Sequence, residues 1–170
     1  GGAIPLPIDW RDVSERLRRY ALALARRHDE ADDLVQQTLA TLLAKAPDKA
    51  GHMGYARATL TRVYLDRERS VKRRLARTLR VGWSTSSAPG GGGDENSARL
   101  HAAIDALPPR QRAALVLRLV EELDYPQIAA ALECSPEAVR SSLHVARAAV
   151  RKAMGEGGDG SSTRERRSSR

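Results

Sequence analysis

The feature that most constrains this 170-residue chain is a Gly/Ser-rich stretch from Gly82 to Ser97, GWSTSSAPGGGGDENS. Such a stretch carries too little apolar surface to order itself by burial, so we predict a flexible linker. On both sides of it, apolar residues recur at helical spacing, and no segment shows a convincing strand-like period of two. The sequence therefore predicts an all-α fold. We expect two small helical domains, at 9–80 and 98–154, joined by a linker at 81–97 and followed by a disordered tail at 155–170.

Three helices are predicted in the first domain. Asp9 can cap the first, because its carboxylate can accept a hydrogen bond from the free amides of the first turn. Acidic residues between Asp29 and Asp33 suit the positive end of the second helix, and Pro47 ends it. The third helix is expected from about Tyr55 to Leu79. The apolar stripes of the first two helices contain Trp10, Val13, Leu17, Tyr20 and Leu24, and then Leu34, Val35, Thr38, Leu39, Leu42 and Leu43.

The second domain ends in a predicted helix-turn-helix motif. Pro109 suits the first turn of the helix that precedes the motif. A compact helix opens at Tyr125, and a longer helix capped by Ser135 runs to about Met154. The turn between them often contains glycine in such motifs. Here Glu133 occupies that neighbourhood, so the turn must either avoid or tolerate a positive φ angle.

The last helix of this motif presents polar residues away from its apolar stripe. Residues at the N-terminal end of such a helix reach base edges, while flanking basic groups hold phosphates. The candidates are Glu137, Arg140, Ser141, His144 and Arg147. An ordinary helical hairpin with a solvated face would show a similar pattern, so the pattern favours DNA binding without excluding that alternative.

The predicted third helix of the first domain is strongly basic. Nine Lys or Arg residues lie between positions 57 and 80, against two acidic ones, and the whole chain has a net charge of +8. This charge favours a polyanionic partner, but it does not distinguish DNA, RNA and an anionic membrane. Aromatic rings among arginines can stack on unpaired bases. Tyr55 is interpreted as a core residue, whereas Tyr64 fits either the core or base stacking.

The sequence does not indicate an enzyme. Its four histidines and the single Cys134 show no metal-ligand spacing, and the glycines at 90–93 open no strand–turn–helix unit that could hold a phosphate. We therefore expect no catalytic residues, no metal and no cofactor. No apolar run approaches the roughly 20 residues of a membrane span, so membrane insertion is not expected. A single cysteine fits a cytoplasmic protein.

Three segments, in their order along the chain, resemble an extracytoplasmic-function sigma factor of the sigma-70 family. EADDLVQQTLATLL resembles the helix that grips the clamp of RNA polymerase, and YARATLTRVYLDRERSVKRR resembles the segment that melts and reads the −10 promoter element. ALPPRQRAALVLRLVEELDYPQIAAALECSPEAVRSSLHVARAAVR resembles the domain that reads the −35 element. The resemblance covers roughly Trp10 to Arg74 and Leu100 to Met154. The short linker also fits, because this group lacks the middle domain of larger sigma factors.

The resemblance implies a role for individual residues. The polymerase-binding set is Asp32, Asp33, Leu34, Gln36 and Gln37. The −10 set is Arg62, Tyr64, Asp66, Arg69, Lys72, Arg73 and Arg74. The −35 set is Arg110, Glu137, Arg140, Ser141, His144 and Arg147. Arg62 stands where this family commonly has Asn, and Ser142 replaces a frequent Arg, which removes one candidate phosphate contact.

The resemblance also implies the partners. These are the clamp and flap regions of core RNA polymerase and promoter DNA, both duplex and single-stranded, in the cytoplasm and at the nucleoid. An anti-sigma factor is a further candidate, since members of this group are often held inactive by one. Two alternatives stay open. A stand-alone helix-turn-helix regulator would bind duplex DNA without polymerase, and a basic RNA-binding protein would prefer RNA at matched salt.

Overall fold

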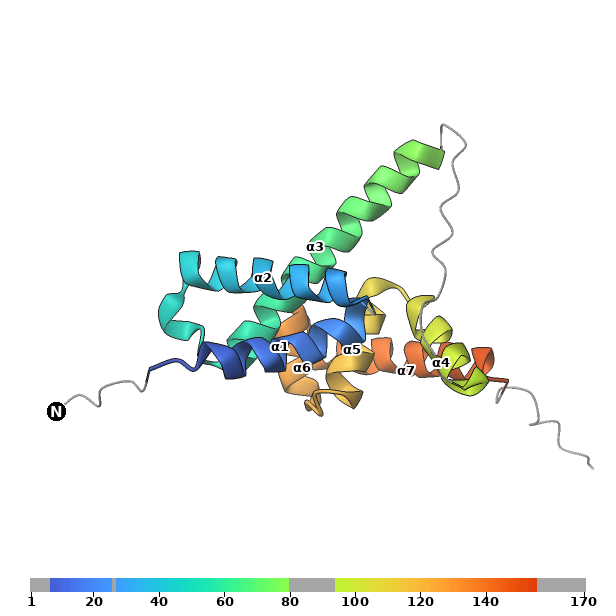
Figure 1. The fold of residues 1–170 in the computed structure, drawn as a ribbon. Helices are drawn as coiled ribbons and strands as arrows, with labels where there is room; N and C mark the ends of the chain where they lie inside the picture. The colour runs from blue at the N-terminus through green and yellow to red at the C-terminus, as the bar shows by residue number, and fades with distance from the viewer. Residues whose placement is uncertain (1–6, 26, 80–93, 156–170) are drawn as a thin grey trace, which may run out of the picture.

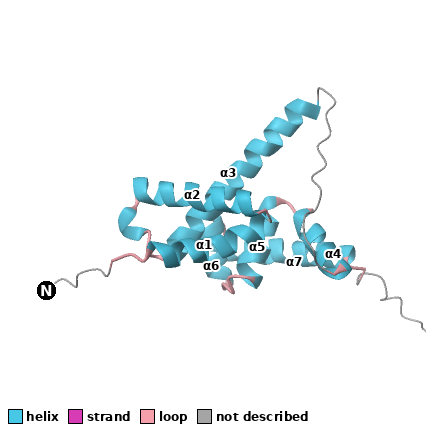
Figure 2. Ribbon diagram, viewed as in Figure 1, coloured by secondary structure: helices cyan, strands magenta, loops and turns pink. Residues whose placement is uncertain are grey.

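The computed structural model describes residues 7–25, 27–79 and 94–155, and the elements within these ranges are helical (Figure 2). No strand occurs in the described ranges, so the prediction of an all-α fold is confirmed. Most of the predicted linker and all but the first residue of the predicted tail lie outside them. The elements are α1 (Trp10–Ala25), α2 (His28–Lys45), a short 3-10 turn η1 (Pro47–Lys49), α3 (Met53–Leu79), α4 (Glu95–Asp105), α5 (Pro109–Leu119), α6 (Tyr125–Leu132) and α7 (Pro136–Ala153).

Helices α1 and α2 pack against each other and against α3 (Figure 1). The Asp9 carboxylate accepts hydrogen bonds from the amides of Arg11 and Asp12, as expected of an N-cap. Tyr20 is fully buried, and its hydroxyl lies 2.8 Å from that of Thr61 on α3. Burial raises the pKa of Tyr20, although the hydrogen bond with Thr61 works in the opposite direction. The phenol therefore stays neutral and links α1 to α3.

The predicted apolar stripes of α1 and α2 form most of this core, with exceptions at their ends. Trp10 is 36% exposed at the start of α1, and Leu43 is 54% exposed near the end of α2. Helix α2 ends at Lys45, before Pro47, as predicted. The exposed Leu43 lies seven residues, about two turns, after Gln36, so the two side chains share one face of the helix.

Helix α3 has 27 residues and is about 40 Å long at 1.5 Å per residue. Its first half packs between the other helices and buries one side against them, whereas its second half projects from the body (Figure 1). Residues 71–77 are exposed along the projecting part. This part therefore presents the basic end of the helix to solvent.

The second half of the chain begins earlier than predicted. Helix α4 starts at Glu95, inside the segment assigned to the linker, because the Asp94 carboxylate caps it by accepting from the Ser97 amide at 2.7 Å. Pro109 stands at the first position of α5, as expected. Asp124 and Gln127 form a reciprocal capping box at the start of α6.

The two predicted domains pack into one body in this structure. Helix α3 contacts α6 and α5, and α1 contacts α5 (Figure 1). Buried residues from both halves form one hydrophobic cluster. The division into domains stays a prediction, but the two halves are not separated in space.

Candidate promoter and polymerase interface

The turn between α6 and α7 tolerates a positive φ angle at Glu133. Glu133 has φ 54° and ψ 49°, which is the left-handed region that glycine adopts at low cost. The amides of Glu133 and Cys134 donate to carbonyls of the last turn of α6, at 3.4 and 3.0 Å. The Ser135 hydroxyl then caps α7 by accepting from the Ala138 amide at 3.1 Å. The helix-turn-helix geometry predicted from the sequence is therefore present without a glycine.

Helix α7 separates its apolar and polar residues onto two faces. Val139, Leu143 and Ala146 are buried against the other helices. The exposed polar residues of its N-terminal half are Glu137, Arg140, Ser141 and His144, and Arg147 is half-buried one turn further on. The structure thus brings together on one face the residues predicted to read a major groove.

Tyr125 is a neighbour of this face that sequence reasoning missed. The guanidinium groups of Arg118 and Arg140 lie 5.6 and 6.0 Å from the centroid of its ring. Cation–π attraction at such distances restrains an arginine without removing its hydrogen-bond donors. Tyr125 therefore orients Arg140, although its position at the start of α6 indicated only a helix start.

Arg110 of the predicted −35 set is already hydrogen-bonded within the protein. Its guanidinium donates to the Leu132 carbonyl at 2.7 Å, at the end of α6. It lies beside Arg62 and Glu133 in a small hollow of about 190 Å³. Arg110 thus supports the turn rather than the exposed start of α7.

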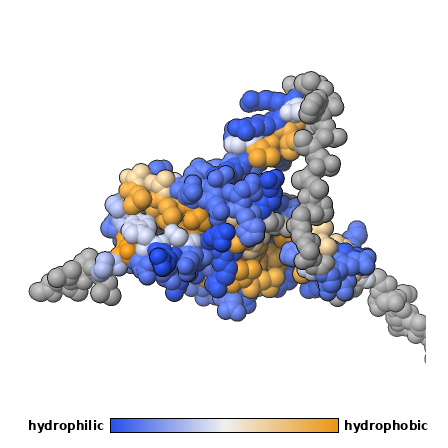
Figure 3. Space-filling model, viewed as in Figure 1, coloured by the Kyte–Doolittle hydropathy of each residue, from blue (hydrophilic) through white to orange (hydrophobic). Residues whose placement is uncertain are grey.

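The basic residues of the predicted −10 set lie along α3. Arg62, Asp66 and Arg69 are exposed, as are the members of the set from position 72 to 74. Arg69 forms an ion pair with Asp66 at 3.7 Å. Figure 3 shows that the projecting end of α3 also carries apolar surface, and Val71 and Leu75 are 48% and 38% exposed there. The end of α3 therefore combines positive charge with exposed aliphatic side chains.

The structure decides between the two interpretations left open for Tyr64 and reverses the expectation for Tyr55. Tyr64 is 2% exposed, and its hydroxyl accepts a hydrogen bond from Arg112 of α5 at 2.8 Å. Burial raises its pKa, although the Arg112 charge opposes this. Of the two interpretations of Tyr64, this structure therefore shows the core one, and its place in the −10 set stays a prediction. Tyr55, which we interpreted as core, is 40% exposed beneath Lys49, and that interpretation is wrong.

Helix α2 places some of the predicted polymerase-binding residues on its surface and one of them, Leu34, in the core. Asp33 and Gln36 are exposed. Asp32 pairs with Arg18 at 2.8 Å, and the Gln37 amide oxygen accepts from Arg67 at 2.9 Å. Leu34 is 2% exposed, so in this structure it supports the helix from inside. The exposed Leu43 was not assigned to this set, and it adds apolar surface to the face that carries Gln36.

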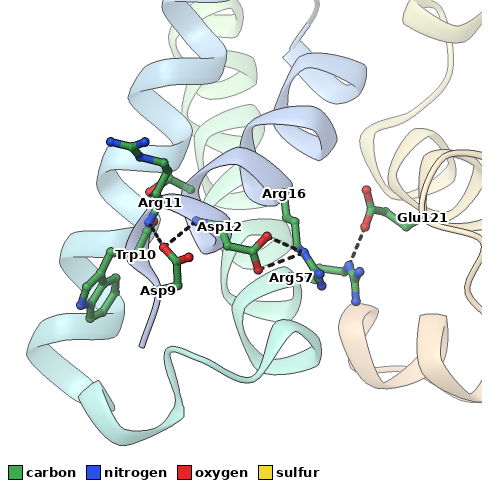
Figure 4. Close-up of polar contacts among 8 residues, drawn as sticks. Asp9, Trp10, Arg11, Asp12, Arg16, Arg57 and Glu121 are labelled. Carbon is green, nitrogen blue, oxygen red and sulfur yellow. Dashed lines mark hydrogen bonds and ion pairs between the residues drawn. The ribbon is translucent and has the colours of Figure 1, made fainter. Parts of the chain in front are cut away.

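A further polar cluster, also missed by sequence reasoning, joins the two halves. Glu121 follows α5, and its side chain is 1% exposed; it accepts from Arg57 of α3 at 2.6 Å (Figure 4). Its other carboxylate oxygen has no hydrogen-bond partner, and Arg19 of α1 lies 3.9 Å from it. Arg62 of α3 forms a separate ion pair with Glu133 at the end of α6. We call the contacts Arg57–Glu121, Arg62–Glu133 and Tyr64–Arg112 the closed interface.

Other kinds of site are not found in the described ranges. No group of three or more His, Cys, Asp or Glu side chains there is arranged to hold a metal ion. Within the same ranges, no helix has the length and apolar character needed to cross a membrane.

Two families of protein domains match this chain. Residues 97–150 match sigma-70 region 4, and residues 15–64 match the sigma2 domain of PhyR. The chain also shares its fold with the sigma factor RpoE of Bartonella quintana, solved in complex with the anti-sigma factor NepR. The TM-score is 0.66 at 24% identity, over 85% of this chain and 93% of that one.

Curated relatives extend the match over most of the chain. The ECF RNA polymerase sigma factor SigE of Mycolicibacterium smegmatis is 29% identical over 149 residues, which cover 83% of this chain and 58% of that protein. The chain therefore spans a little over half the length of that relative. ECF RNA polymerase sigma factor EcfG of Rhodopseudomonas palustris is 31% identical over 141 residues, which cover 77% of this chain and 75% of that protein. This chain thus belongs to the extracytoplasmic-function RNA polymerase sigma factors of the sigma-70 family.

Proposed function

We propose that this chain is a promoter-specificity factor that binds core RNA polymerase, recognises −35 and −10 elements and enables transcription initiation. The observation that carries the proposal is the polar face of α7, which gathers Glu137, Arg140, Ser141 and His144 at the exposed start of a capped helix-turn-helix. The factor itself is non-catalytic in this proposal. It acts in the cytoplasm, and at the nucleoid when it is part of the holoenzyme.

Recognition of the −35 element is assigned to α7. A helix that enters the major groove by its N-terminal end places its first exposed residues against base edges. Arg140 can donate two hydrogen bonds to one guanine, whereas Glu137 can accept from a cytosine amino group. His144 and Arg147, further along the helix, are placed for the flanking phosphates.

Recognition and opening of the −10 element are assigned to α3. Each phosphate that the exposed basic residues of positions 69–74 neutralise releases counterions, so binding should weaken steeply as salt rises. Flipping a base out of the duplex costs a few kcal/mol, which contacts to the flipped base must offset. Arg62 and Asp66 are assigned to those contacts by resemblance to the family.

Polymerase binding is assigned to the outer face of α2. Asp33 and Gln36 are exposed there, and Leu43 contributes an apolar side chain to the face that carries Gln36. The solved relative is held by an anti-sigma factor, and a partner of that kind is part of this proposal for the present chain.

Run-off transcription tests the proposal. Purified full-length protein would be mixed with core RNA polymerase on fragmented genomic DNA, and start sites would be mapped. The expected result is a set of transcripts with shared sequences at −35 and −10 that vanish without the protein. A gel shift with and without core polymerase is the companion measurement. Tight, sequence-specific binding of the free protein, with no transcripts on adding core, would overturn the proposal in favour of a stand-alone regulator.

A further inference from the structure

Helix α7 carries one large aliphatic side chain that does not pack into the core. Val145 is 51% exposed, whereas Val139 and Leu143 of the same helix are fully buried. No other large aliphatic side chain of α7, a helix that the structure describes in full, is exposed. Single exposed aliphatic residues are common on protein surfaces, so the position of Val145 decides its interpretation.

Val145 lies on the face of α7 to which we assign −35 recognition. It follows Ser141 by four residues, and residues at this spacing lie on the same side of a helix, about 6 Å apart along its axis. Ser141 and His144, the residue before Val145, are both exposed. Leu143 and Ala146 point away from this face and into the core. Val145 therefore meets whatever α7 binds, which in the proposed function is the major groove of DNA.

The major groove offers a favourable partner to an aliphatic side chain at thymine. Every base presents hydrogen-bond donors or acceptors there, and thymine adds the apolar C5-methyl group. A valine placed against a polar base edge displaces water without replacing its hydrogen bonds, which weakens binding. Against a thymine methyl group, the same side chain buries apolar surface of both partners. The chemistry of Val145 therefore favours thymine over cytosine, which lacks this methyl group.

We propose that Val145 is a specificity-determining residue that contacts the C5-methyl group of a thymine in the −35 element. This inference rests on the proposed function, since it requires α7 to lie in a major groove. Arg140 and Val145 are five residues apart, which is about 7.5 Å along the helix axis, or roughly two base-pair steps of about 3.4 Å. The thymine therefore lies within about three base pairs of the pair that Arg140 reads.

Removal of a single methyl group from the DNA tests the contact. Deoxyuridine pairs as thymidine does but lacks the C5-methyl group, so each substitution changes one candidate contact only. Full-length protein would be assembled with core polymerase, and promoter fragments from the run-off experiment would be altered at each −35 thymine in turn. Competition binding should show that one substitution weakens binding about three- to fivefold, the factor expected for one buried methyl group. The other thymines should tolerate the change.

Variants of Val145 connect that thymine to this side chain. Val145→Ala should bind the thymine and deoxyuridine fragments equally, because the partner of the methyl group is gone. Val145→Ile keeps a β-branched aliphatic side chain and should retain the preference for thymine. Val120→Ala, at a valine that is 37% exposed after α5, is the matched control and should respond to deoxyuridine as the parent protein does. Alanine favours a helix more than valine does, so Val145→Ala does not lose the preference by unfolding α7.

The outcomes separate this contact from the proposed function. If transcription succeeds but no thymine near the Arg140 pair responds to deoxyuridine, or if Val145→Ala keeps the preference, the inference is overturned and the proposed function stands. An equal loss for Val145→Ala on every sequence would make Val145 a contact to the DNA backbone, which also overturns the inference. If no transcript appears with core polymerase, the proposed function fails. The same substitutions in duplexes that the free protein selects from a random pool then decide the contact, and failure to select any sequence overturns it.

Discussion

Replacing Glu133 by Gly should stabilise the protein, although it removes an ion pair. Glu133 adopts a left-handed backbone conformation, which is about 1 kcal/mol less favourable for a residue with a Cβ atom. Glycine has no Cβ atom and adopts this conformation without that cost. The lost Arg62–Glu133 pair joins two side chains that are 60% and 65% exposed, and such pairs contribute about 0–1 kcal/mol. The two terms oppose each other, so the net gain for Glu133→Gly is between zero and about 1 kcal/mol.

Glu133→Ala separates the two terms, because it loses the same pair but retains the strained backbone. It should destabilise the protein by up to about 1 kcal/mol, the size of an exposed pair. The free energy of unfolding of Glu133→Gly should therefore be about 1 kcal/mol higher than that of Glu133→Ala. For a chain of this length, this difference corresponds to about 2–4 °C in the midpoint of thermal unfolding. Urea unfolding followed by helical circular dichroism would give both free energies of unfolding.

The order of these two variants is the decisive result. If Glu133→Ala equals or exceeds Glu133→Gly in stability, the left-handed backbone at Glu133 is not a source of strain, and the reasoning is refuted. Glu122, with φ 55°, offers an independent repeat of the comparison at the exposed loop after α5. Glu122→Gly should likewise be more stable than Glu122→Ala, and neither change affects the Arg62–Glu133 ion pair.

Three further predictions concern the core and the two proposed interfaces. Leu143→Ala removes a fully buried side chain of α7 and should lower the free energy of unfolding by about 2–5 kcal/mol, measured by urea titration. Asp33→Ala combined with Gln36→Ala should weaken binding to core polymerase while leaving affinity for a −35 duplex unchanged; unaltered holoenzyme assembly would contradict the proposed α2 contact. Arg140→Ala should cost about 1–3 kcal/mol in discrimination at one −35 base pair, measured by competition binding. An equal loss on every sequence would instead make Arg140 a phosphate contact.

The starts of helices were predictable where capping residues or proline determine them. Asp9, Ser135 and Pro109 stand at helix starts because a capping side chain or a fixed φ angle acts within one turn. The start of α4 was not predicted, because Asp94 lies in a Gly/Ser-rich segment that we assigned to the linker. The capping hydrogen bond from the Ser97 amide to Asp94 is nevertheless a local interaction of the usual kind. Local rules therefore located most helices to within a few residues.

The candidate site was predictable only in part, because burial depends on the whole fold. The exposed face of α7 followed from its periodicity, but the burial of Tyr64 depends on Arg112, which lies 48 residues away in the chain. Likewise the carboxylate of Glu121 is buried by Arg57, 64 residues before it. No spacing rule along one helix connects residues at such separations. The closed interface could therefore be found only in the folded structure.

Two departures from common patterns that looked independent in the sequence meet in the structure. Arg62 stands where the resembling family commonly has Asn, and Glu133 stands in a turn where glycine is frequent. The structure pairs these two side chains across the two halves of the chain. An Asn at position 62 would carry no charge for Glu133, and a Gly at 133 would leave Arg62 without this carboxylate. The strained backbone at Glu133 thus accompanies a contact that neither of the common residues can make, which links the irregular turn to the packing of the two halves of the chain against each other.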